Sequence, residues 1–295
     1  MRTLLTILFY AACFELNGQR ISKELLIEKI SDVIENHHAI VGVAVMDSRG
    51  KELIQINGEN HFPMQSVYKF HLALAVLHNV DQQRLQLDQI ISVNATDLDQ
   101  STHSPMREER KTKTFDITIG ELLYYSVALS DNNACDILFK LMDGVKSVQG
   151  YLTSLGERNV SVAATESEMS TGWDVQFSNW TTPVAAARLL ERYYSTPLLN
   201  TPTHDFLWNQ MVKSIRGERI KGMLPEGTVL AHKAGTSARN SEQVQAAFND
   251  IGIVMLPNGK HFSIAFFIMN SKESDQENAK VTATISKLVW EYFVQ

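Results

Sequence analysis

The sequence predicts an α/β fold in which a helical lobe is inserted into an antiparallel sheet. Strand-like apolar runs occur near both ends of the chain, at residues 40–46, 53–56, 228–232, 251–256 and 262–269. Turn-forming residues separate neighbouring runs, since Asp-Ser-Arg-Gly at 47–50 and Pro-Asn-Gly at 257–259 favour hairpins. Because helical patterns fill the middle of the 295-residue chain, the first and last segments are expected to build one sheet together.

Helices are expected both beside this sheet and in the middle of the chain. Residues 22–36 carry apolar side chains at helical spacing, and a final helix is predicted from about residue 277 to 293. These terminal helices would pack on the sheet. The segment 67–80 is apolar nearly all round, which predicts a buried central helix. Further helical stretches are predicted at 122–129, 134–142 and 182–193.

The predicted organisation has two lobes that share one functional site. An α/β lobe would comprise residues 19–60 and 205–295, and a helical lobe residues 61–204. A chain of 295 residues is long enough to bury a core of its own in each lobe.

The first 18 residues differ in composition from the rest. Arg2 gives a basic start, residues 4–14 form an apolar run of secretory length, and Gly18 is a small residue at a cleavage position. A mature chain starting near Gln19 is expected, located in the periplasm or outside the cell. A buried amphipathic helix is the alternative, and lipid attachment at Cys13 is another.

Composition excludes several classes of function. A net charge of −6 gives no support to nucleic-acid binding, which needs a basic face. No run approaches the roughly 20 apolar residues that span a bilayer. No cluster of His, Asp and Cys has zinc spacing and no glycine loop fits a phosphate, so no metal or cofactor is expected. After cleavage only Cys135 remains, expected as a small buried side chain without a disulfide. A monomer is expected.

The string Ser66-Val67-Tyr68-Lys69 indicates an activated serine nucleophile. Positions i and i+3 of a helix lie one turn apart on the same face, so Ser66 and Lys69 are placed to interact. Burial on the central helix disfavours the Lys69 ammonium, which suits a base or proton shuttle. The backbone N–H of Ser66, at the positive end of the helix, would face a reacting carbonyl. The alternative is a helix N-cap serine with Lys69 exposed.

Two further strings accompany the first. Ser130-Asp131-Asn132 supplies a hydroxyl and an amide, although all three residues are also good helix caps. Lys233-Ala234-Gly235 lies on a predicted strand. The three strings together nearly complete a set that is typical of class A β-lactamases and penicillin-binding proteins.

The chain resembles a class A serine β-lactamase, and residues 62–70 resemble the PER/VEB-type extended-spectrum branch in particular. The resemblance covers nearly the whole mature chain. It implies the serine β-lactamase/DD-peptidase fold, with a five-stranded antiparallel sheet flanked by the terminal helices. It implies a hydrolase that opens the amide of penicillins and cephalosporins through a serine acyl-enzyme, conferring antibiotic resistance, with a small-molecule β-lactam as its partner.

The resemblance also assigns roles to residues around the nucleophile. Ser130 would relay a proton to the leaving nitrogen, Asn132 would bind the acylamino side chain, and Asp131 would tie down the loop. The backbone N–H groups of Ser66 and Thr236 would form the oxyanion hole.

The substrate carboxylate would be bound by Lys233 and by Arg219, a second binder typical of the PER/VEB-type branch. Ala234 lacks the hydroxyl that the family has there, so the hydroxyls of Thr236 and Ser237 would partly substitute.

A glutamate on the loop 163–174 would activate the water that hydrolyses the acyl-enzyme. Glu166 is the candidate and Glu168 the fallback, while surface exposure is the alternative for either. The family usually closes this loop with an arginine–aspartate ion pair, but the matching positions here are Ala164 and Asn179. An asparagine usually helps to hold the water, and Ser170 stands at its position.

Two other functions remain open at this point. A penicillin-binding DD-peptidase shares the serine and lysine but usually lacks the loop glutamate. A β-lactam sensor or decayed paralogue would acylate without turnover. The base that serves acylation, Lys69 or Glu166, is also left open.

Overall fold

The computed structural model describes residues 21–215 and 218–295. The expected signal segment 1–18, the alternative of a buried helix there and the alternative of lipid attachment at Cys13 lie outside the described residues. Within the described ranges, no helix is long and apolar enough to cross a membrane. Cys135 is fully buried and free, as expected.

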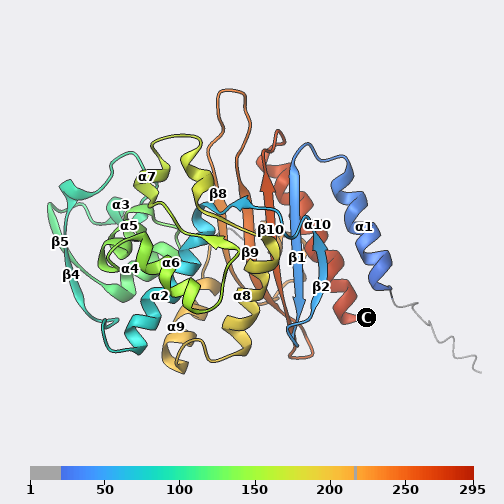
Figure 1. Ribbon diagram of the computed structural model, residues 1–295, viewed down its shortest axis with the longest axis horizontal. Helices are drawn as coiled ribbons and strands as arrows, with labels where there is room; N and C mark the ends of the chain where they lie inside the picture. The colour runs from blue at the N-terminus through green and yellow to red at the C-terminus, as the bar shows by residue number, and fades with distance from the viewer. Residues whose placement is uncertain (1–20, 216–217) are drawn as a thin grey trace, which may run out of the picture.

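A five-stranded antiparallel sheet forms the centre of the α/β part (Figure 1). Its strand order, β2-β1-β10-β9-β8, places strands from the two ends of the chain side by side, with Ile40 opposite Met269 in the β1–β10 pair. The predicted sheet is therefore confirmed, with somewhat longer strands: β1 (Ile40–Asp47), β2 (Glu52–Ile56), β8 (Leu230–Thr236), β9 (Phe248–Met255) and β10 (His261–Met269).

Helices cover both faces of this sheet because strand side chains alternate between them. Val43 and Val45 pack with α1 (Lys23–Glu35) and α10 (Asp275–Val294), which lie side by side in Figure 1. On the opposite face, α8 (Pro183–Ser195) contacts β1, β9 and β10. This helix belongs to the segment assigned to the helical lobe, and the lobe boundaries stay a prediction.

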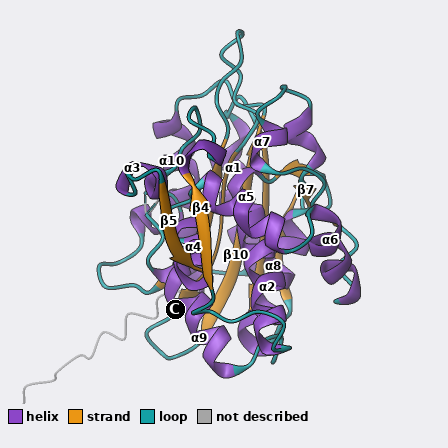
Figure 2. Cartoon of the chain, turned by 90° about the vertical axis from the view of Figure 1, so that its left-hand side faces the viewer, coloured by secondary structure: helices purple, strands orange, loops and turns teal. Residues whose placement is uncertain are grey.

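The helix α2 (Tyr68–Asp81) is the core of the helical part. All its side chains from Tyr68 to Leu77 are buried, as its apolar sequence predicts. Other helices contact it on several sides and gather around it in Figure 2. The remaining helices are α3 (Pro105–Glu109), α4 (Ile119–Val127), α5 (Asn132–Leu141), α6 (Val145–Ser154), α7 (Glu166–Met169) and α9 (Thr201–Val212).

Short strands bring the segment before Ser66 next to the end of the loop 163–179. Phe62 of β3 (Phe62–Pro63) pairs with Thr181 of β7 (Trp180–Thr181), and Met64 N–H donates to Asn179 O at 2.8 Å. β6 (Val160–Ser161) adds the third strand, and β4 (Ile90–Asn94) pairs with β5 (Thr114–Thr118) as a separate hairpin. The 3₁₀ turns are η1 (Gln65–Val67), η2 (Ala95–Asp97), η3 (Val175–Ser178) and η4 (Ile220–Met223).

Candidate active site

Ser66 lies in the turn η1 that leads into α2. The preceding residue, Gln65, has a left-handed backbone with φ of 48°. Strand β8 packs directly on this turn, since a Cβ at Gly235 would lie 2.6 Å from Met64 O and 3.0 Å from Ser66 N. Only glycine allows this approach. No side chain caps η1 or α2, so the N-cap alternative for Ser66 is wrong.

Lys69 gathers three of the predicted site residues around its buried amine. Nζ lies 3.0 Å from Glu166 Oε1 and donates to Ser130 O at 2.8 Å and Asn132 Oδ1 at 2.5 Å. The side chain is fully buried, so the alternative of an exposed Lys69 is also wrong. Ser66 lies one turn earlier on the same helix face.

The string 130–132 combines a helix cap with groups that face the site. Asp131 is the N-cap of α5, accepts from Ala134 N–H at 2.8 Å and from Met106 N–H at 2.7 Å, and is fully buried. The capping alternative thus holds for Asp131. The side chains of Ser130 and Asn132, on either side of it, face the site instead, where Ser130 Oγ accepts from Lys233 and Asn132 Oδ1 accepts from Lys69. Asn132 Nδ2 donates to Thr102 Oγ1 at 2.7 Å.

Lys233 approaches the site from β8. Its Nζ donates to Ser130 Oγ and to Ala234 O, each at 2.9 Å. Burial, and after it the charge of Lys69, holds the pKa of Lys233 well below its ordinary value. Because Lys233 donates to the Ser130 hydroxyl, the proton of that hydroxyl remains available for transfer.

Thr236 presents its backbone N–H at the edge of the sheet. Ser237 N–H donates to Ala247 O at 2.9 Å, and inward and outward N–H groups alternate along an antiparallel pair. The N–H of Thr236 therefore points away from β9, on the side where Gly235 meets Ser66. This is the placement that an oxyanion donor needs.

Arg219 lies buried beneath the same edge. One guanidinium nitrogen, Nη2, donates to Thr236 Oγ1 at 2.6 Å, while Nη1 donates to Gly235 O and Asn249 O. The guanidinium also lies 3.6 Å above the Phe248 ring. Ser237 is placed differently, because its Oγ accepts from Ala247 N–H at 3.0 Å, on the side of β9.

The loop 163–179 is held by amide hydrogen bonds where the family has an ion pair. Asn179, fully buried, accepts from the N–H groups of Ala163 and Ala164 at 2.7 and 2.9 Å and donates to Ala164 O. Glu168 is exposed and forms a capping box with Thr165, so it is turned to its own helix end. Ser170 Oγ likewise donates within its own turn, to Ser167 O at 2.7 Å.

Asp136 is a site residue that the sequence reasoning missed. Its carboxylate accepts from Glu166 N–H at 2.8 Å and Ser167 N–H at 2.9 Å. Burial raises the pKa of Asp136 to about 6. Its position four residues after Asn132, on the same face of α5, is the sequence signal that could have found it.

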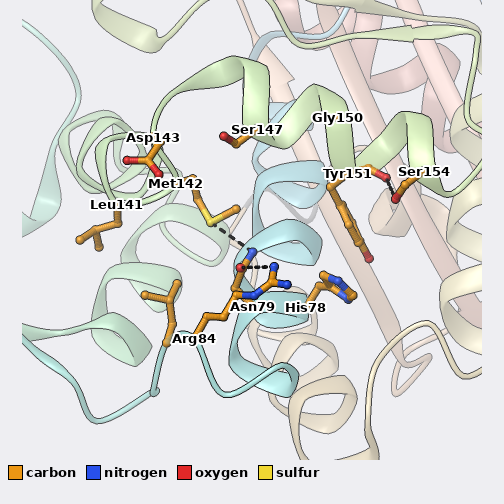
Figure 3. Close-up of a pocket in the computed structure, with 11 residues that line it drawn as sticks. His78, Asn79, Arg84, Leu141, Met142, Asp143, Ser147, Gly150, Tyr151 and Ser154 are labelled. Carbon is orange, nitrogen blue, oxygen red and sulfur yellow. Dashed lines mark hydrogen bonds between the residues drawn. The ribbon is translucent and has the colours of Figure 1, made fainter.

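The cavity in Figure 3 contains none of the predicted site residues. It measures about 550 Å³ and lies between α2 and α6, with His78 and Asn79 in its wall. His78 is nine residues beyond Lys69, or roughly 14 Å along the helix. Among the residues described, no three His, Cys, Asp or Glu side chains form a candidate metal site.

Comparisons with known proteins agree with this geometry. The profile of the Beta-lactamase enzyme family matches residues 25–293. β-Lactamase VEB-1 of Pseudomonas aeruginosa is 41% identical over 269 residues, covering 90% of this chain and 89% of that protein. Extended-spectrum β-lactamase PER-1 of the same organism is 38% identical over 291 residues, covering 98% and 92%. The crystal structure of TLA-1 extended-spectrum β-lactamase has a TM-score of 0.90 at 42% identity, covering 92% of this chain and 99% of that one. This chain therefore belongs to the class A serine β-lactamase family, in the branch of PER-1 and VEB-1.

Proposed function

We propose that this protein hydrolyses the β-lactam amide of penicillins and cephalosporins through an acyl-enzyme on Ser66. One observation carries the proposal above all others. The buried Lys69 amine contacts Ser130, Asn132 and Glu166 at the base of the helix turn that carries Ser66. A nucleophile, a proton shuttle and a second base are thus within reach of one reacting carbonyl.

In acylation, Ser66 Oγ attacks the lactam carbonyl and gives up its proton to Lys69, or to Glu166 through a water. The N–H groups of Ser66 and Thr236 stabilise the negative charge on the carbonyl oxygen. The C–N bond then breaks, Ser130 donates its hydroxyl proton to the leaving nitrogen, and the proton taken from Ser66 passes to Ser130 Oγ in its place. Lys233, 2.9 Å from Ser130 Oγ, supports this transfer.

In deacylation, Glu166 takes a proton from a water that attacks the acyl carbonyl, the bond from the acyl carbon to Ser66 Oγ breaks, and the proton is returned to Ser66 Oγ. The position of Glu166 depends on Asp136, which holds the backbone N–H groups of residues 166 and 167. Glu168 is the fallback base, but its capping box with Thr165 favours Glu166 for this role.

The substrate carboxylate is bound by Lys233, Arg219 and the Thr236 hydroxyl. Arg219 already donates to Thr236 Oγ1 at 2.6 Å, so that hydroxyl can turn its own proton to the carboxylate. This pair partly offsets the missing hydroxyl at Ala234. Ser237 keeps a lesser role because its hydroxyl oxygen is engaged by Ala247 N–H. Asn132 binds the acylamino side chain.

We further propose that the enzyme is a monomer in the periplasm or outside the cell, divided into the lobes 19–60 with 205–295 and 61–204. The first 18 residues support export, and the net charge of −6 speaks against a nucleic-acid partner.

Mixing the purified protein with a chromogenic cephalosporin tests the function. We expect many turnovers per protein molecule. A single stoichiometric burst would instead indicate a DD-peptidase or a sensor, which acylate and stop. The sensor is favoured by one specific observation, namely that Ser170 bonds its own turn and leaves Glu166 to position the water alone.

A further inference from the structure

A chain of buried amides joins the edge of the site to the start of α10. Gln245 Nε2 donates to Ser237 O at 3.2 Å, and Gln245 Oε1 accepts from Asn278 Nδ2 at 3.2 Å. Gln245 is 2% exposed and Asn278 is fully buried. Ser237 directly follows Thr236, so the chain ends one residue from the proposed oxyanion donor.

Asn278 is the anchor of this chain. Its Oδ1 contacts His37 Nε2 at 2.7 Å and accepts from Ser271 Oγ at 2.9 Å. Gln245 and Ser271 also exchange a pair of backbone hydrogen bonds, and Gln245 Nε2 donates to Asp275 Oδ1 at 3.1 Å. Each nitrogen and oxygen of the two amide side chains therefore has at least one partner, as is usual for buried polar groups. Loss of either would leave several buried partners unsatisfied.

These amide hydrogen bonds matter for the shape of the site edge because β8 and β9 are joined by a long connection. Residues 237–247 separate the two strands, whereas a two-residue hairpin turn would fix its flanking strands by itself. Both backbone groups of Ser237 are held instead. Its N–H donates to Ala247 O, and its carbonyl oxygen accepts from Gln245 Nε2. The β8–β9 pair therefore sets the direction of the Thr236 N–H, and Gln245 adds a contact from outside the pair that holds the backbone directly after Thr236.

We propose that Gln245 and Asn278 are positioning residues for the oxyanion donor at Thr236. The inference rests on the proposed function and assigns neither residue any contact with the substrate. An oxyanion donor acts only within a narrow range of distance, and a shift of about 1 Å can cost roughly 100-fold in rate. A small rotation of Ser237 therefore reduces catalysis without closing the site.

The test compares Gln245→Ala and Asn278→Ala with the matched control Gln210→Ala. Gln210 is also buried, and its amide donates to Phe206 O within its own helix α9. Kinetics with the chromogenic cephalosporin and melting temperatures are measured for each protein. The infrared carbonyl band of the acyl-enzyme, trapped in a Glu166→Ala background, reports the hydrogen bonds to the acyl oxygen.

We expect kcat and kcat/KM to fall together by about 10- to 100-fold in both variants. The acyl carbonyl band should move to higher frequency because its hydrogen bonds weaken. Gln210→Ala should lower the melting temperature but stay within about twofold in kcat. A merely structural role predicts the same melting loss with unchanged kcat and carbonyl band, and that result would overturn the inference.

Isosteric variants decide the matter if the alanine variants do not fold. Gln245→Glu keeps an oxygen that accepts from Asn278 but has no N–H to donate to Ser237 O. Asn278→Asp keeps an oxygen that accepts from Ser271 but has no N–H to donate to Gln245. The same criteria apply to them. A wild-type chain that shows no turnover contradicts the proposed function itself, whereas active wild type with unaffected variants contradicts this inference alone.

Discussion

Two glutamates of this protein, the buried Glu191 and the partly buried Glu166, have opposite surroundings. Glu191 of α8 accepts from His261 Nε2 at 2.9 Å, Ser263 Oγ at 2.9 Å and Ser195 Oγ at 2.6 Å. Glu166 has Lys69 at 3.0 Å as the partner of its carboxylate. Burial alone would raise the pKa of Glu191, but the hydrogen bonds from its three partners outweigh burial and lower it.

The difference shows how a buried carboxylate can serve structure or chemistry. Both oxygens of Glu191 accept from donors on α8 and β10, so the group joins these two elements. Glu166 shares its lysine with Ser130 and Asn132, and the cluster draws on α2, α5, α7 and β8. Substitutions in the two clusters should therefore affect different properties.

The largest effect should come from removing the nucleophile. Ser66→Ala should lower kcat by about 10⁴-fold or more, because no acyl-enzyme can form. Steady-state kinetics with the chromogenic cephalosporin provide the measurement, and Ser154→Ala on α6 serves as the control. Turnover at the wild-type rate in Ser66→Ala would remove the nucleophile assignment.

Glu166→Ala should separate acylation from deacylation. We expect turnover to fall about 10³-fold while an acyl-enzyme accumulates, which mass spectrometry detects as an added substrate mass. Glu168→Ala is the matched control, since that side chain is exposed and only caps its helix. If Glu168→Ala accumulates the acyl-enzyme and Glu166→Ala does not, the fallback residue is the base.

Glu191→Gln should affect stability and leave the chemistry intact. Breaking this buried pair should lower the free energy of unfolding by about 3 kcal/mol, with kcat unchanged. A lowered pKa means that wild-type Glu191 stabilises the fold above its unfolded pKa of about 4.3, and this contribution is lost as pH falls further. Urea unfolding at pH 7 and pH 3 should show a smaller acid loss in the variant; equal losses would contradict the assignment.

Asp136 should link the deacylation loop to pH. Above its pKa of about 6 the carboxylate accepts both N–H groups of residues 166 and 167, and protonation below that pH removes one acceptor. We expect kcat for a deacylation-limited substrate to fall below pH 6. Asp136→Asn should be about tenfold slower at pH 7.5 and lack this step. Asp143→Asn, at an exposed position, is the control and should keep the wild-type pH profile of kcat. A wild-type pH profile in Asp136→Asn would contradict the role assigned to Asp136.

Ala234→Thr should give the smallest change. A restored hydroxyl can add a hydrogen bond to the substrate carboxylate and raise kcat/KM by up to about tenfold. Ala234→Val has the same shape without the hydroxyl and should give no gain. Equal values for both variants would mean that Lys233, Arg219 and Thr236 already satisfy the carboxylate.

The sequence predicted much of the site because its motifs are local. Ser66 and Lys69 are three residues apart, so one helix turn fixes their relation. The runs of apolar residues likewise predicted the sheet and the buried helix α2. Asp136 and the pair of Gln245 and Asn278 were missed, because Asp136 bonds a loop 30 residues away and Gln245 bonds Asn278 33 residues away, without a local sequence motif.

The amino-acid sequence by itself determined which segments become strands and helices, since periodicity and turn residues act over a few positions. Only the tertiary structure decided which of two loop glutamates meets Lys69, and that Ser237 turns to β9 while Thr236 presents its N–H to the site. The physical reason is that hydrogen bonding and burial of these groups depend on helices, loops and strands that approach one another only in the folded protein.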